Sequence, residues 1–231
     1  MEIHASLWTQ MLAGILGQDA HTLALWDHVI AAVIVFAILG AMSLLLNSRL
    51  SPIPGGFQQL MEVIVEGLLD MLDDNIGEKG KKYLPLVGTL ALFIFVANFL
   101  GMVPSFSAAT GNFNTTVACA LIVFIYYNYQ GLKEHGLGYV KHFMGPVPAL
   151  APIMFPIEII SHLSRPFSLA VRLFCNISGE HLVSLVFYTQ LFAWLVPLPI
   201  MCIGLFAAFL QAFIFIMLTM VYIAGAIAHE H

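Results

Sequence analysis

The chain has 231 residues, of which 60% are hydrophobic and only 9% are charged, and its formal net charge is −5 at pH 7. A soluble domain carries about 25% charged residues, so this composition excludes a soluble globular protein and indicates an integral membrane protein. The sequence contains no basic patch of the kind that binds nucleic acid.

The apolar residues lie in long runs, which favour helices over a β-barrel. Charged residues and histidines are absent from 18 residues at 29–46, from 50 at 83–132 and from 47 at 182–228. One helical crossing takes about 20 apolar residues, so each of the two longer runs holds more than one crossing. A membrane β-strand would alternate apolar and polar residues instead. With no signal-peptide pattern and no internal repeat, we expect a single membrane domain over residues 1–231.

The first predicted crossing, 26–46, ends at the charge, prolines and glycines of "NSRLSPIPGG". Residues 56–74 then form an amphipathic pattern, which predicts a cytoplasmic surface helix rather than a crossing. Its acidic face comprises Glu62, Glu66, Asp70 and Asp74, and its apolar face Met61, Ile64, Val65, Leu68 and Leu72. A carboxylate metal site is the weaker alternative, because no second set of ligands converges on these acids.

The next apolar run divides at "MVPSFSAATGNFN" into a predicted hairpin of helices at 84–103 and 114–129. Two long helices follow, at 147–187 and 199–228. The first of them has 41 residues and would be about 60 Å long, against about 30 Å of hydrocarbon. We therefore expect a long, strongly tilted pair, and an all-α membrane protein with about five crossings plus one amphipathic surface helix.

The basic residues predict the orientation of the chain. Of the eight Lys and Arg, six lie outside the apolar segments, in two loops, at Arg49, Lys79, Lys81, Lys82, Lys133 and Lys141. Residues 1–25 and 102–114 contain none. By the positive-inside rule both basic loops face the cytoplasm and the N-terminus faces outward. Five crossings then put the C-terminus in the cytoplasm.

Arg172 is the most informative candidate residue. A mid-bilayer arginine costs at least about 2.5–3.5 kcal/mol to insert, so such residues are usually functional. Snorkelling to the interface or a structural ion pair are the alternatives, and snorkelling suits Arg165 better because it lies nearer the cytoplasmic end. Asn176 lies one helical turn after Arg172 and Glu180 two turns after it.

Further polar residues extend this stripe toward the cytoplasmic end, at Glu158, Ser161, His162 and Ser168. Acids, histidines, hydroxyls and amides in one row are typical of membrane proton relays. On the last helix, Tyr222 lies on the cytoplasmic side. Gln211 lies at about the depth of Arg172 if the two helices pair antiparallel, although a lone Gln more often joins helices.

Enzymatic motifs are missing. The sequence has no nucleophilic triad, phosphate loop, dinucleotide fingerprint or zinc spacing, and its three cysteines (Cys119, Cys175 and Cys202) are far apart. We therefore expect no enzyme activity from the chain alone, no cofactor and no metal.

Four stretches carry a family resemblance: "PIEIISHLSRPFSLAVRLFCNISGEHL", "LQAFIFIMLTMVYIAGAIAHEH", "NFNTTVACAL" and "PGGFQQLMEVIVEGLLDML". Taken together, and in their order along the chain, these stretches resemble the bacterial type of subunit a of the F-type ATP synthase membrane sector. The resemblance implies a proton-translocating stator subunit in the bacterial plasma (inner) membrane. Its expected partners are the lipid bilayer, a rotor ring of small c-type subunits and peripheral-stalk b-type subunits.

The resemblance also implies roles for individual residues. Arg172 matches the essential arginine that faces the ring carboxylates. An outer half-channel then involves Asn176, Glu180, His181 and Gln211, and a cytoplasmic half-channel involves Glu158, Ser161, His162, Ser168 and Tyr222.

Two positions depart from the family's pattern. Members usually carry an acid or histidine nine positions after the arginine, paired with a group on the last helix. Here His181 is ninth and Glu180 eighth, while the partner position is Gly204. Either Glu180 or His181 can therefore be the outer proton carrier. Gly101 stands where some members carry an acid, so that helix contributes only Asn98.

Two functions from other classes are less well supported. A proton-coupled secondary transporter with Arg172 on an anionic substrate predicts repeats or a broken helix pair, and the sequence shows no repeat. A purely structural scaffold leaves Arg172 and Glu180 without a role.

Overall fold

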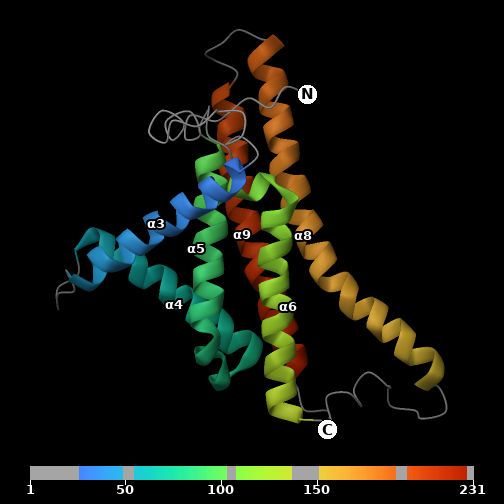
Figure 1. Cartoon of the computed structure of the whole chain (residues 1–231). Coiled ribbons are helices and arrows are strands. Elements are labelled where there is room, and N and C mark those ends of the chain that lie inside the picture. The colour runs from blue at the N-terminus through green and yellow to red at the C-terminus, as the bar shows by residue number, and fades with distance from the viewer. Residues whose placement is uncertain (1–25, 49–54, 103–107, 137–150, 191–196, 228–231) are drawn as a thin grey trace.

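The computed structural model of the chain describes residues 26–48, 55–102, 108–136, 151–190 and 197–227. Over these residues it is helical throughout and contains no strand (Figure 1). In chain order the elements are α3 (Asp27–Ser48), α4 (Gly56–Ile76), η1 (Glu78–Tyr83), α5 (Leu84–Gly101), η2 (Ala109–Gly111), α6 (Phe113–His135), α8 (Ala151–Gln190) and α9 (Pro197–Ile227). The predicted all-α fold is confirmed. The helix ends predicted at 103, 147 and 228 lie outside the described residues.

Three described helices are long and apolar enough to cross a membrane by length and composition: Asp27–Ser48, Glu78–Gly101 and Cys202–Ile227. The 40-residue α8 is more polar and contains Pro156 and Pro166, which weaken its backbone hydrogen bonding. Figure 1 shows it crossing obliquely to the upright α5, α6 and α9. An oblique path is how a helix of this length fits a bilayer.

The core lies where α5, α6, α8 and α9 meet. Large apolar side chains fill it, and alanines let the helices approach closely. The buried residues on these helices include Val87, Ile94, Ala97, Ala120, Val123, Leu169, Ala170, Leu173, Ala212, Phe215, Met220 and Ile223.

Helices α3 and α4 extend to one side of this core (Figure 1). α3 buries only Ala31 and Val35 and exposes large apolar side chains such as Phe36, 62% exposed, which suits a helix surrounded by lipid. α4 buries Leu68 and Leu72, while its four regularly spaced acids are all exposed. The predicted amphipathic helix is therefore present, and its apolar face packs partly on the chain itself.

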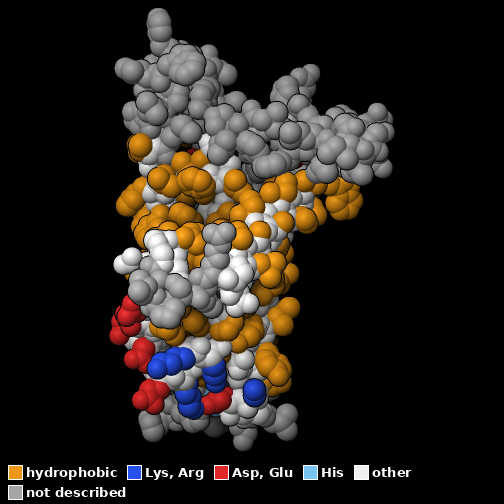
Figure 2. All heavy atoms as spheres, turned by 90° about the vertical axis from the view of Figure 1, so that its left-hand side faces the viewer, with side chains coloured by type: hydrophobic (Ala, Val, Ile, Leu, Met, Phe, Trp, Pro, Cys, Tyr) orange, Lys and Arg blue, Asp and Glu red, His pale blue; other side chains and the backbone are white. Residues whose placement is uncertain are grey.

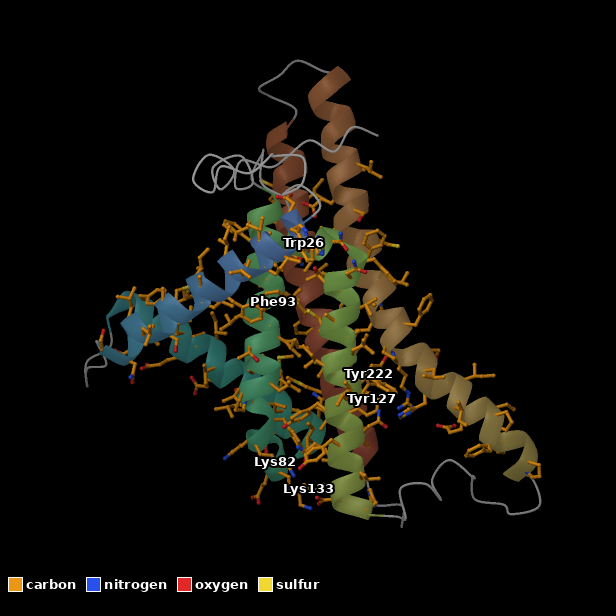
Figure 3. The ribbon with its side chains drawn as sticks, in the orientation of Figure 1. Trp26, Lys82, Phe93, Tyr127, Lys133 and Tyr222 are labelled. Atoms are coloured by element: carbon orange, nitrogen blue, oxygen red, sulfur yellow. The ribbon has the colours of Figure 1, made fainter. Side chains whose placement is uncertain are left out.

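Charged side chains gather at one end of the molecule, below a broad apolar band (Figure 2). There Lys79 Nζ of η1 lies 2.7 Å from Glu134 Oε1 near the end of α6. Lys82 and Lys133 lie at this same end, and Trp26 lies toward the opposite one (Figure 3). The described basic residues of the two predicted loops thus lie at one end of the molecule, whereas Arg49 and Lys141 lie outside the described residues.

The packing of η1 against α4 depends on Gly80, which lies within η1. A Cβ there would lie 2.6 Å from the carbonyl oxygen of Leu72 and 3.0 Å from its carbon. Backbone atoms cannot move aside as a side chain can, so we expect Gly80→Ala to destabilise the protein by about 1–3 kcal/mol. The measurement is the thermal unfolding midpoint of the purified protein. Gly67→Ala on α4, where a Cβ meets nothing within 4 Å, is the matched control. Equal midpoints for the two variants would contradict the expectation.

Candidate functional site

Arg172 lies on the outer surface of α8. Of the four acidic and basic residues of this described helix it is the one that is exposed, whereas Glu158, Arg165 and Glu180 are partly buried. The exposed residues within one turn of it are Ser168, Cys175 and Asn176, and Phe167, five residues before it, is 64% exposed. Among the described residues Arg172 has no hydrogen bond or ion pair. A cation exposed on the surface of a helix in lipid is costly, so this face calls for an anionic group from outside the chain.

Asn176 and Gln211 meet between α8 and α9. Asn176 Nδ2 donates a hydrogen bond of 2.7 Å to Gln211 Oε1, and Gln211 is only 2% exposed. The structure therefore brings together two of the predicted outer residues, one turn from Arg172. The bond also joins the two helices, the commoner role of a lone Gln.

Glu180 packs against Gly204 of α9. A Cβ on Gly204 would overlap Glu180 Oε1, and it would lie 2.9 Å from Glu180 Cδ and 3.3 Å from Met102 Cε. The glycine thus leaves the space that the carboxyl group occupies. His181 belongs to α8, but its side chain lies outside the described residues.

A second polar pair lies between α5 and η2. Thr110 Oγ1 donates a 2.6 Å hydrogen bond to Asn98 Oδ1, and both residues are buried. Asn98 Nδ2 has no partner among the described residues. At Gly101 a Cβ would overlap Ala108, so this close approach leaves no room for an acidic side chain. Thr110 was not predicted from the sequence, because it lies in a stretch interpreted only as a loop.

On the other side of Arg172, His162 is buried between α8 and α6. Its Nε2 lies 2.8 Å from Asn128 Oδ1 and 3.2 Å from Tyr127 Oη. Tyr127 is 1% exposed, and its ring centroid is 6.0 Å from that of Tyr222 on α9 (Figure 3). Tyr127 and Asn128 were not predicted as site residues from the sequence. The only signal was the polar cluster "IYYNYQ" at the end of an apolar helix.

Arg165 contacts the same cluster. Its Cζ lies 5.6 Å from the centroid of the Tyr222 ring, within the range of a cation–π interaction. Arg165 is thereby held toward α9 while Arg172 is not.

The remaining predicted residues also lie on α8. Ser161 and Ser168 are exposed, and Glu158 is partly buried nearer the start of the helix. Across the described ranges, no group of three or more His, Cys, Asp or Glu side chains could hold a metal ion.

These groups form two polar sets on either side of Arg172. One set precedes it on α8 and meets Tyr127, Asn128 and Tyr222; the other follows it and meets Gln211 and Gly204 of α9. Each set contains groups that hydrogen-bond water or exchange protons. A fixed cation between them opposes direct passage of a proton from one set to the other.

Comparisons with known proteins show which family this chain resembles. The family model described as "ATP synthase A chain" matches residues 28–224. "ATP synthase subunit a" of Sulfurihydrogenibium sp. (strain YO3AOP1) is 47% identical over 206 residues, which are 89% of this chain and 99% of that protein. "ATP synthase subunit a 3" of Pelobacter propionicus is 44% identical over 229 residues, 99% of this chain and 100% of that protein. "ATP synthase subunit a" of Geobacter sulfurreducens is 48% identical over 198 residues, 86% of each chain.

Proposed function

Since the chain belongs to the ATP synthase A chain family, we propose that Arg172 is the fixed cation at which its protons change sides of the membrane. The protein is the proton-translocating stator subunit of the F-type ATP synthase. It is a multi-pass membrane protein that works within that complex and is not catalytic by itself.

The proposal rests on the exposure of Arg172 on the surface of α8, where it has no hydrogen bond or ion pair among the described residues. Its partner would be a rotor ring of small c-type subunits, each presenting one carboxyl group to lipid. Burial in lipid keeps such a carboxyl group protonated, whereas a nearby cation favours its ionised form. Arginine suits this role because it stays charged where a buried lysine can lose its proton.

Two offset half-channels would bring protons to the ring and take them away. The outer one would use Asn176, Glu180, His181 and Gln211. The cytoplasmic one would use Glu158, Ser161, His162, Ser168 and Tyr222. The separation of the two polar sets along α8 supports this division, because a proton then crosses only by travelling with the ring.

The orientation follows from the charged end of the molecule. We place Lys79, Lys81, Lys82 and Lys133 in the cytoplasm, with the N-terminus outside and the C-terminus inside. The membrane would be a bacterial plasma (inner) membrane, since the chain resembles the bacterial type of subunit a. Peripheral-stalk b-type subunits would be further partners within the membrane.

Native cysteines offer a direct test of the ring-facing surface. Cys175 is exposed three residues after Arg172, so a maleimide should label it in the isolated subunit in detergent. In the assembled complex the ring should cover it, and we expect its labelling, measured by mass spectrometry, to fall at least about tenfold. Buried Cys119 is the internal control, which should stay unlabelled in both. Equal labelling of Cys175 in both preparations would contradict a ring on this face.

A further inference from the structure

The orientation of the Asn128 side chain is determined by its own helix. Asn128 Nδ2 lies 2.7 Å from the carbonyl oxygen of Phe124 one turn earlier. A backbone carbonyl only accepts hydrogen bonds, so the amide NH₂ must point toward it. The reverse orientation would set two acceptors against each other at that distance. Oδ1 is therefore the atom that faces His162.

This orientation decides where His162 carries its proton. Asn128 Oδ1 accepts but cannot donate, and it lies 2.8 Å from His162 Nε2. The nitrogen must therefore bear a hydrogen. The hydroxyl oxygen of Tyr127, 3.2 Å from the same nitrogen, can share that hydrogen as a second acceptor. In a neutral imidazole with a proton on Nε2, the lone pair is on Nδ1.

Aromatic rings of α6 hold the imidazole in this position. The centroids of the Phe124 and Tyr127 rings lie 5.4 and 5.2 Å from that of His162, which is 8% exposed. A ring flip would exchange the two edges of the imidazole and break the contact with Asn128. The imidazole therefore keeps one edge toward α6.

We infer that Asn128 is a positioning residue: it keeps the proton of neutral His162 on Nε2, so that Nδ1 alone takes up and releases the transported proton. Neither an amide oxygen nor the neutral hydroxyl oxygen of Tyr127 is basic enough to receive that proton, so the Nε2 edge is closed to proton transfer. The ring binds one proton at Nδ1 to become imidazolium and returns it from the same atom. This inference rests on the proposed passage of protons past His162.

Among the residues that the structure describes, other titratable or charged groups near His162 lie on three helices. Glu158 and Arg165 lie four residues before and three after it on α8, Tyr127 lies on α6, and Tyr222 lies on α9. The test keeps all four and changes only Asn128. Asn128→Asp preserves the size and the acceptor while adding a negative charge, and Asn128→Leu removes the acceptor.

The measurement is ATP-driven proton pumping by the whole ATP synthase in inside-out membrane vesicles, per assembled complex, as a function of medium pH. A carboxylate beside the ring stabilises the imidazolium form, so we expect Asn128→Asp to move the midpoint of the pH profile up by about one unit. Asn128→Leu should move it down. The catalytic sector is the same in every preparation. The pH dependence of ATP hydrolysis therefore contributes equally to every profile and cancels when the midpoints of two variants are compared. Asn114→Asp, at an exposed position near the other end of α6, is the matched control and should leave the midpoint unchanged.

Three results would overturn the inference. The first is an unchanged midpoint in Asn128→Asp, which differs from the native residue by one atom and is expected to assemble. The second is the same upward shift in a chain that also carries His162→Leu. The third is a native pH profile in His162→Leu alone. Each of these leaves the role of Arg172 intact, because that role is tested by loss of coupled synthesis and not by a pH midpoint.

Discussion

Proton-driven ATP synthesis is expected to fall by at least about 100-fold in the Arg172→Ala variant, in the range found when one preorganised charge is removed from a reaction site. Without the cation, a ring carboxylate reaching this face of α8 has no positive partner and stays protonated. The ring then neither releases its proton nor turns productively. Synthesis is measured in vesicles energised by an imposed proton gradient.

The same variant should also leak protons, because nothing separates the two polar sets along α8. Arg172→Lys tests the need for a permanent charge and should retain less than native synthesis, since a desolvated lysine can lose its proton. Lys81→Ala removes an exposed cation at the charged end of the molecule and should leave synthesis unchanged. Coupled synthesis at the native rate, without leak, in Arg172→Ala would falsify the proposed role.

Gly204→Val is expected to slow proton conduction about 10- to 100-fold, the second largest effect predicted here. Its Cβ would overlap Glu180 Oε1. The carboxyl group lies at the end of a flexible side chain, so it moves aside while the helices stay in place. A displacement of about 1 Å can cost about 100-fold when proton transfer depends on position. Passive conduction through the membrane sector is measured after removal of the catalytic sector.

The matched control is Gly225→Val on the same helix α9, where a Cβ meets nothing within 4 Å. It adds the same side chain and should conduct normally. Glu180→Gln and His181→Ala then identify the outer carrier, because the variant of the true carrier should be as slow as Gly204→Val. Native conduction in both of these variants would show that protons enter elsewhere.

Arg172 could be singled out from the sequence because charged residues are rare in segments that lie in the bilayer. In a segment that must lie in lipid, each charge carries a large insertion cost, so one arginine among apolar residues indicates function without any knowledge of its neighbours. Because polar groups are costly in lipid, a helix that crosses the bilayer also needs an apolar run of a minimum length. The three apolar helices of crossing length and the amphipathic helix were therefore accessible from the order of the residues.

The contacts across helices were not accessible in this way. In a soluble helix, the polar face shows which side points outward, but α5 and α9 are apolar on all sides, and so the sequence does not show which face meets which neighbour. The same holds for α6, where Tyr127 and Asn128 were interpreted only as the end of a crossing. In the structure their side chains contact His162. Thr110 was interpreted as part of a loop, although it pairs with Asn98.

The sequence by itself determined the class of protein and the succession of its helices, and it singled out Arg172 as the candidate cation, because solvation by lipid acts on each residue separately. The tertiary structure alone decided that Gly204 makes room for Glu180, that Gln211 receives Asn176 and that Asn128 orients His162. These depend on how each helix is rotated about its axis and on which helix lies beside it. Packing among many side chains sets that rotation, so it cannot be inferred from the type of any single residue.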